Sequence, residues 1–163
     1  MTGIYLLLGS NLGDRKGHLA RACELIEQKV GVVTDRSNIY RTEAWGSTQQ
    51  PSYYNQVVKI NTDLVPSRLL DEILSIEEEI GRVRQSKWES RIIDIDILYY
   101  NQQILDESRL ALPHPQIPNR RFTLVPLCEL APDLKHPQLG MTNIELLENC
   151  EDQLLVEPLR SKL

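Results

Sequence analysis

The sequence has few cysteines, no long apolar run and no excess of positive charge. Its three cysteines are far apart and odd in number, which fits neither a disulfide framework nor a zinc site. No apolar run approaches the roughly 20 residues that cross a bilayer. The first residues lack the basic region and the apolar length of a signal peptide. We therefore expect a soluble protein of the cytoplasm.

The composition is that of one ordinary globular domain. Hydrophobic residues make up 41% of the chain and charged residues 25%, which argues against disorder. A chain of 163 residues can bury about two thirds of its unfolded surface without disulfides or metals. No repeat, low-complexity stretch or linker divides it. We expect a single domain over residues 1–163.

The net charge of −5 argues against a general nucleic-acid-binding surface. A basic cluster interrupts this acidic background, because Arg82, Arg84, Lys87 and Arg91 lie within ten residues against the single acid Glu89. Cations gathered in an acidic protein favour a small anionic ligand. A solvated loop has the same composition, and the cluster alone does not decide between the two.

Hydrophobic periodicity predicts the order strand, helix, strand, strand, helix, strand, followed by a mixed tail. This order is that of a split βαβ arrangement, in which helices cover one face of an antiparallel sheet and leave the other face free. The predicted strands cover residues 4–8, 32–42, 53–62 and part of 91–100, and the predicted helices cover 15–29, 66–80, 122–130 and 142–149.

The stretch RIIDIDILYY alternates isoleucine with aspartate. Ile93, Ile95 and Ile97 fall on one face of a strand, and Asp94 and Asp96 fall on the other. We expect the isoleucines to face the core and the aspartates to face the open side of the sheet. Two carboxylates so close repel each other unless a cation lies between them, and hard oxygen ligands in small number suit Mg²⁺. The alternative is an edge strand that resists aggregation with charge.

Two other groups of side chains extend this hypothesis. His114, Arg120 and Arg121 lie in an irregular, proline-rich stretch, and arginine holds phosphate oxygens in bidentate fashion. Carboxylates that hold a metal ion, next to cations that hold phosphate, indicate a binding site for a nucleoside triphosphate. Tyr53 and Asn55 share a strand face, which provides a ring for stacking and an amide that reads the edge of a flat heterocycle. Each of these residues also has an ordinary structural interpretation.

The turn GSNLGD lacks the Lys-Ser/Thr pair of a Walker A motif, so we do not interpret it as a phosphate loop. Its glycines are expected to let a ligand approach the backbone closely. The two histidines outside the basic stretches, His18 and His136, are expected at the surface.

Taken together and in order, the motifs resemble the 6-hydroxymethyl-7,8-dihydropterin pyrophosphokinase family. The resemblance covers about residues 4–160, and several spaced motifs are far more specific than one Asp-x-Asp pattern. The stretches that carry it are LLLGSNLGD at 6–14, YRTEAWG at 40–46, QPSYYNQVV at 50–58, EEEIGRVR at 77–84, KWESRIIDIDIL at 87–98 and LPHPQIPNRRFTLVPLCELAP at 112–132.

The resemblance implies an α+β, ferredoxin-like split βαβ fold with an antiparallel sheet in three αβα layers. It implies an ATP-dependent pyrophosphokinase of folate biosynthesis, in which ATP donates its β,γ-pyrophosphoryl group to the hydroxymethyl oxygen of the pterin and AMP leaves. The expected partners are ATP and the pterin, without nucleic acid or membrane. We expect a monomer, with a homodimer as the alternative.

The resemblance also implies roles for individual residues. Asp94 and Asp96 would be metal ligands that hold two Mg²⁺ ions. The residues implied in catalysis are Arg82, Arg91, Asp94 and Asp96; those implied in ATP binding are Glu77, Arg84, Trp88, Arg91, Arg109, His114 and Arg120; those implied in pterin binding are Gly9, Thr42, Trp45, Tyr53, Asn55 and Phe122.

Two positions depart from the family pattern, and three other functions compete with it. Glu89 stands where the family usually has glycine, and Trp45 stands where a smaller apolar residue is common. Another Mg²⁺-dependent transferase, such as a nucleotidyltransferase, would release pyrophosphate instead of AMP. A ferredoxin-like RNA-binding domain would need aromatic side chains on a basic sheet face. An inactive homologue would bind nucleotide only.

Overall fold

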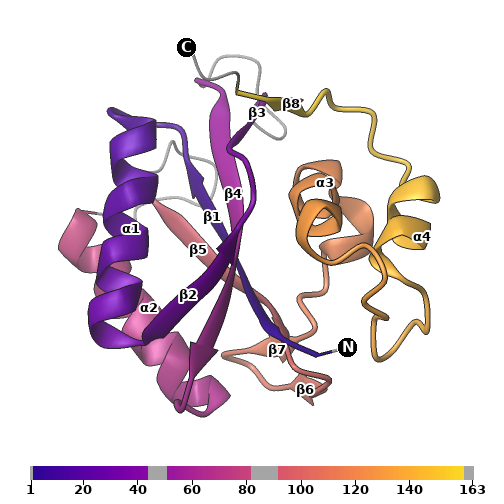
Figure 1. Cartoon of the computed structure of the whole chain (residues 1–163), viewed down its shortest axis with the longest axis horizontal. Coiled ribbons are helices and arrows are strands. Elements are labelled where there is room, and N and C mark those ends of the chain that lie inside the picture. The colour runs from indigo at the N-terminus through magenta and orange to yellow at the C-terminus, as the bar shows by residue number, and fades with distance from the viewer. Residues whose placement is uncertain (1, 44–50, 82–91, 160–163) are drawn as a thin grey trace.

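The computed structural model describes residues 2–43, 51–81 and 92–159. It contains a central sheet with helices on both faces and a small two-stranded sheet at one side (Figure 1). Among the described helices, none has the length and apolar character needed to cross a membrane. The elements are β1 (Ile4–Ser10), α1 (Arg15–Lys29), β2 (Gly31–Arg36), β3 (Tyr40–Thr42), β4 (Tyr53–Thr62), α2 (Pro66–Ile80), β5 (Asp94–Tyr100), β6 (Leu105–Asp106), β7 (Ala111–Leu112), the 3₁₀ helix η1 (Ile117–Asn119), α3 (Arg121–Leu130), α4 (Asn143–Glu148) and β8 (Glu157–Pro158).

The large sheet has the strand order β5-β1-β4-β3-β8. Strand β2 pairs with the second half of β4, and β3 pairs with its first half. All of these pairs are antiparallel. Helix α1 connects β1 with β2, and α2 connects β4 with β5, so each helix joins two strands that flank a third. This is the ferredoxin-like split βαβ topology that the sequence predicts, and the prediction is confirmed.

The extended stretch predicted over residues 32–42 is divided into two strands. Ser37 lies between β2 and β3, where its backbone N–H donates to the Val57 carbonyl at 2.9 Å. Its hydroxyl oxygen accepts a hydrogen bond from the Val57 N–H at 3.0 Å. These bonds keep the stretch attached to β4 while the chain changes direction before β3.

One face of the sheet packs against α1 and α2. The apolar residues of both helices recur every three or four positions, which places them in a stripe that faces the sheet. The isoleucines of the aspartate-bearing strand lie on this face, as predicted. The buried residues of this first core include Leu6, Leu8, Leu19, Ile26, Leu69, Ile73, Ile93, Ile95 and Ile97.

The opposite face is covered by α3, α4 and the chain that connects them (Figure 1). The expectation that helices leave this face free is therefore wrong over most of the sheet, whereas the three αβα layers implied by the family resemblance are confirmed. The reason is visible in β1, whose seven residues are all buried because the strand is apolar on both faces. The second core includes Tyr5, Leu7, Val57, Leu98, Tyr99, Leu124, Leu127, Leu134 and Leu146.

Local signals mark the helix ends as expected. Pro66 occupies the first turn of α2, and Gly81 ends that helix with a φ of 115°, a left-handed conformation that glycine adopts without strain. Thr142 caps α4 in a capping box with Glu145.

His136 is buried, with 4% of its surface exposed, so the expectation of a surface residue is wrong. Its Nδ1 accepts hydrogen bonds from the backbone N–H groups of Gln138 and Leu139, at 3.2 and 3.1 Å. The ring also contacts the Tyr99 ring in an edge-on arrangement at 5.8 Å. Burial lowers the pKa of His136 from its usual 6.5. The folded protein therefore holds the neutral ring as the acceptor that closes the turn.

We predict that this buried ring makes the fold less stable in mild acid. The unfolded chain takes up a proton near pH 6.5 and the folded chain does so only at lower pH, so the free energy of unfolding falls as the pH drops below about 6.5. The substitution His136→Asn keeps a side-chain acceptor and removes the titration. Urea unfolding of both proteins between pH 7.5 and 5 should show a smaller loss of stability in the variant, and equal losses would contradict this account.

Candidate functional site

The antiparallel pairing of three strands places Asp94, Gly9 and Asn55 in one row across the sheet. Gly9 is opposite Asn55 of β4 on one side and opposite Asp94 of β5 on the other. Because neighbouring strands lie about 4.8 Å apart, the row spans about 10 Å from Asp94 to Asn55. Its middle position carries no side chain. The row therefore forms a flat floor between a carboxylate and an amide.

The amide of Asn55 has a defined orientation. Asn55 is 3% exposed, and its Nδ2 donates to the Thr42 hydroxyl at 3.1 Å. A Cβ atom added to Gly9 would lie 2.7 Å from the Asn55 Oδ1 and 3.7 Å from the Tyr53 ring. The amide oxygen therefore lies over Gly9, where it is placed to accept hydrogen bonds from a ligand. The structure thus brings together four residues that the sequence analysis assigns to pterin binding: Gly9, Thr42, Tyr53 and Asn55.

The beginning of β5 is attached to α2 by a buried carboxylate. Glu77 is 2% exposed, and its Oε2 accepts a hydrogen bond from the backbone N–H of Ile95 at 2.8 Å. Ile95 lies between the two aspartates, so this bond holds the short segment that carries them. Asp96 keeps 29% of its side-chain surface exposed at this end of the sheet.

His114 lies beside the aspartates because its backbone pairs with β5. Its N–H donates to the Leu98 carbonyl at 2.9 Å, and its Nδ1 accepts from the Gln116 N–H at 3.1 Å. With Nδ1 used as an acceptor, the ring proton lies on Nε2, which is 4.0 Å from the Asp96 Oδ2. Burial, together with the nearby charge of Arg120, lowers the pKa of His114 to about 4 against the opposing effect of Asp94. At neutral pH the ring is thus an uncharged donor.

Arg120 and Phe122 flank the same region from the start of α3. The Arg120 guanidinium lies 5.6 Å from the centre of the Phe122 ring, and its charge is felt by the His114 ring. Arg109 lies elsewhere, paired with Asp71 on the exposed side of α2 at 2.6 Å. The remaining site residues predicted from the sequence lie outside the described residues: Arg82, Arg84, Trp88, Arg91 and Trp45.

The site offers few protein ligands for a cation. Within residues 2–43, 51–81 and 92–159, no group of three or more His, Cys, Asp or Glu side chains gathers in a way that could hold a metal ion. On β5, Asp94 and Asp96 provide oxygen ligands that lie on the same face of the strand. Such a pair suits Mg²⁺, which keeps several waters and takes further ligands from bound phosphates.

A family comparison favours one of the competing functions. Residues 5–132 match the family model described as 7,8-dihydro-6-hydroxymethylpterin-pyrophosphokinase (HPPK). This chain belongs to that family. A relative from Methylorubrum extorquens is 48% identical over 82% of this chain and 85% of its own. One from Haemophilus influenzae is 39% identical over 96% of this chain and 98% of its own. Both are named 2-amino-4-hydroxy-6-hydroxymethyldihydropteridine pyrophosphokinase.

Solved structures agree on the fold. The Plasmodium falciparum HPPK-DHPS protein with pterin and p-hydroxybenzoate superimposes with a TM-score of 0.72 over 91% of this chain, at 19% identity. This chain spans only 42% of that longer protein. At this identity the likeness supports the ferredoxin-like architecture and no more.

Arg15 is a residue of the site that sequence reasoning missed. It begins α1, and its guanidinium donates to the Ser52 carbonyl and hydroxyl, each at 2.9 Å. It also donates to the Tyr54 hydroxyl at 3.2 Å and lies 3.9 Å from the centre of that ring. These bonds hold the start of β4, directly before Asn55. No local pattern reveals them, because the partners are 37 to 39 residues apart in sequence.

We predict that Arg15→Gln loosens the start of β4 and leaves β5 unchanged. The lost bonds should raise amide hydrogen exchange over residues 51–56 by about tenfold, which corresponds to about 1.4 kcal/mol of local opening. Mass spectrometry of the exchanged protein measures this directly. The neighbouring exposed residue provides the control Lys16→Gln, which should leave exchange unaltered. Equal acceleration over residues 51–56 and 94–100 would contradict a local role.

Proposed function

We propose that this chain transfers the β,γ-pyrophosphoryl group of ATP to the hydroxymethyl oxygen of 6-hydroxymethyl-7,8-dihydropterin and releases AMP in folate biosynthesis. Membership of the pyrophosphokinase family supports this activity. The observation in the molecule that carries it is the row of Asp94, Gly9 and Asn55, which sets a carboxylate and an amide about 10 Å apart on one floor. The nucleotidyltransferase alternative is not favoured, since the named relatives are pyrophosphokinases.

In this proposal the pterin ring lies over Gly9. The Asn55 Oδ1 accepts hydrogen bonds from donors on the ring edge, and its Nδ2 stays bonded to Thr42. Tyr53 and Phe122 stack against the ring faces, where an aromatic contact adds about 0.5–1.5 kcal/mol. We propose that Trp45 contacts the pterin as well. The hydroxymethyl group then points along the row toward β5.

The nucleotide lies on the side of the aspartates. Asp94 and Asp96 would hold Mg²⁺, with two ions proposed, which neutralise phosphate charge when bound. His114 donates its Nε2–H to a phosphate oxygen without adding charge, and Arg120 adds a cation. The further ATP contacts that we propose come from Arg82, Arg84, Trp88 and Arg91. Glu77 is buried against the Ile95 N–H and would act by holding β5, and Arg109 would have to leave Asp71 to reach the nucleotide.

The reaction requires positioning more than covalent help from the protein. The hydroxymethyl oxygen attacks the β-phosphorus in line, the bond from that phosphorus to the α,β-bridging oxygen breaks, and AMP leaves with the bridging oxygen. The hydroxyl proton is released. A floor without side chains lets the pterin slide close to the phosphates, while the Asn55 amide prevents it from rotating in its plane.

We further propose that the functional unit is the whole chain, acting as a monomer in the cytoplasm. The family match ends at residue 132. Residues beyond it still belong to the second core, since Leu134 and Leu146 are buried there. Removing them would expose the apolar face of α3. That helix begins next to Arg120 and Phe122, so the loss would disturb these two residues of the candidate site.

A product assay tests the proposed activity. The protein is mixed with ATP, Mg²⁺ and 6-hydroxymethyl-7,8-dihydropterin, and AMP, ADP and pyrophosphate are separated by chromatography. We expect AMP in amounts equal to the consumed pterin, and only when the pterin is present. Release of free pyrophosphate in step with nucleotide transfer would instead establish a nucleotidyltransferase.

The same assay tests the aspartates. Asp94→Asn and Asp96→Asn should each lower turnover by about a hundredfold or more, equal to about 3 kcal/mol of lost transition-state stabilisation. Asp106→Asn changes an exposed carboxylate of β6 and should leave turnover unaltered. Near-normal turnover in either of the first two variants would contradict their role as metal ligands.

Gly9→Ala tests the floor. The added methyl group would meet the Asn55 Oδ1 at 2.7 Å and displace the amide from its position over the row. We expect the KM for the pterin to rise by about tenfold or more, with little change in the KM for ATP. Ser10→Ala alters the next residue, whose side chain points to the opposite face, and serves as the control. An unchanged pterin KM in Gly9→Ala would contradict the proposed ring position.

A further inference from the structure

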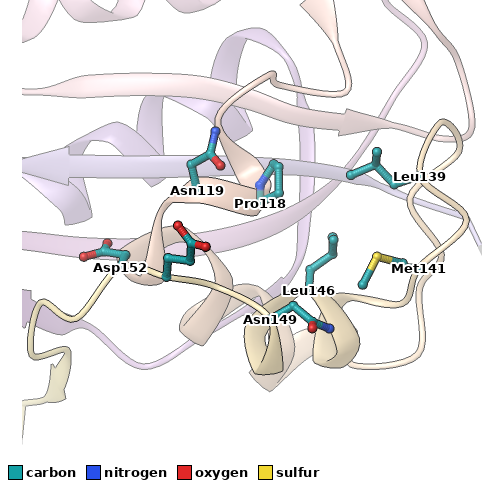
Figure 2. A pocket seen from close by; sticks show the side chains of 8 residues that line it. Pro118, Asn119, Leu139, Met141, Leu146, Asn149 and Asp152 are labelled. Atoms are coloured by element: carbon teal, nitrogen blue, oxygen red, sulfur yellow. The ribbon is translucent and has the colours of Figure 1, made fainter.

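A groove of about 660 Å³ lies between η1 and α4. It shares no lining residue with the row on the sheet. Its apolar lining comes from Pro118, Leu139, Met141 and Leu146. Figure 2 shows Leu139 and Met141 at one end of the groove and Asp152 at the other. Leu139 is 50% exposed, so the apolar surface continues out of the groove.

The polar groups of the groove are mostly hydrogen-bond acceptors. The Asn119 Nδ2 donates to Gln116 at 3.2 Å and the Asn149 Nδ2 donates to the Glu145 carbonyl at 2.8 Å, so each amide keeps its oxygen and one N–H for other partners. The Asp152 carboxylate accepts from two backbone N–H groups, those of Arg121 and Leu154, each at 3.0 Å. The groove therefore offers more acceptors than donors, which favours a ligand that donates hydrogen bonds.

The charged side chains that line the groove, Glu151 and Asp152, are both carboxylates. Residues 136–159 contain five carboxylates and no lysine or arginine, which equals the net charge of −5 of the whole chain. The rest of the chain is balanced. This segment supplies most of the groove lining, whereas the cations Arg120, Arg121 and Lys135 lie just outside it in sequence, so the negative potential is local to Glu151 and Asp152. Such a field attracts cations and speeds their association.

We propose that the groove binds a segment of a partner protein in which an aliphatic side chain lies beside a lysine or arginine. The aliphatic group would fill the apolar end, and the cation would meet Glu151 and the amide oxygens. A protein fits better than a small molecule, because the exposed Leu139 and Ile144 and the acids Glu145 and Glu148 extend the same chemistry beyond the groove. The groove volume is in the range of natural binding sites.

The probe is a synthetic peptide, acetyl-Lys-Leu-Leu-Arg-amide, added to the ¹⁵N-labelled full chain. We expect NMR shift changes confined to residues 118–119, 139–141 and 146–152. The Kd should rise several-fold between about 50 and about 300 mM NaCl, because charge contributes to binding. Leu139→Ser and Glu151→Lys should each raise the Kd by about fivefold or more, equal to about 1 kcal/mol. Neither variant should alter turnover.

Matched control variants distinguish binding in the groove from nonspecific binding of the peptide. Leu155→Ser removes a leucine that is 66% exposed and does not line the groove, and Glu107→Lys reverses a charge elsewhere; both should bind the peptide normally. No binding below about 1 mM peptide, or equal binding of a peptide with glycine for leucine, would overturn the proposal. So would self-association that Leu139→Ser abolishes in sedimentation, because a second copy would then be the occupant.

Discussion

The antiparallel pairing of β1 with β4 on one side and β5 on the other determines where every group of the candidate site lies. It brings the end of β1 between the beginnings of the two neighbouring strands, so residues far apart in sequence meet in one row. Strand spacing then sets the separation of Asp94 and Asn55 without help from side-chain packing. The two helical layers act on this row indirectly. Helix α2 holds β5 through Glu77, and α1 holds β4 through Arg15.

The row also explains why a neutral histidine suits this site. His114 is attached to the outer edge of β5 by its backbone and to the next turn by Nδ1, so its remaining N–H faces the aspartates. A charged ring there would compete with a cation for the same carboxylates. Burial and Arg120 keep the ring neutral, which leaves the carboxylates for metal and the N–H for phosphate.

Regular features of this fold could be predicted from the sequence, and contacts between distant residues could not. The stripes of α1 and α2, the proline and glycine at the ends of α2, and the alternation around Asp94 and Asp96 are local patterns, and all of them are found in the structure. Residue patterns predicted the helices α3 and α4 but not that they cover the second face of the sheet, because that face is recognised only once the sheet is assembled. Burial of His136 was missed because a turn that closes on a side-chain nitrogen has no periodicity. The roles assigned to Arg82, Arg84, Trp88, Arg91 and Trp45 stay predictions.

The bare floor at Gly9 has a consequence for selective inhibition. A ligand that lies flat on it contacts main chain of a central strand, whose polar groups are already used in the sheet. Substitution of side chains does not reshape such a surface, and a larger residue at Gly9 would collide with Asn55 before it reached the ligand. Substitutions that cause drug resistance and preserve activity would therefore have to occur in the side chains around the ring. A compound that contacts mainly the main chain at Gly9 would leave few positions for such substitutions.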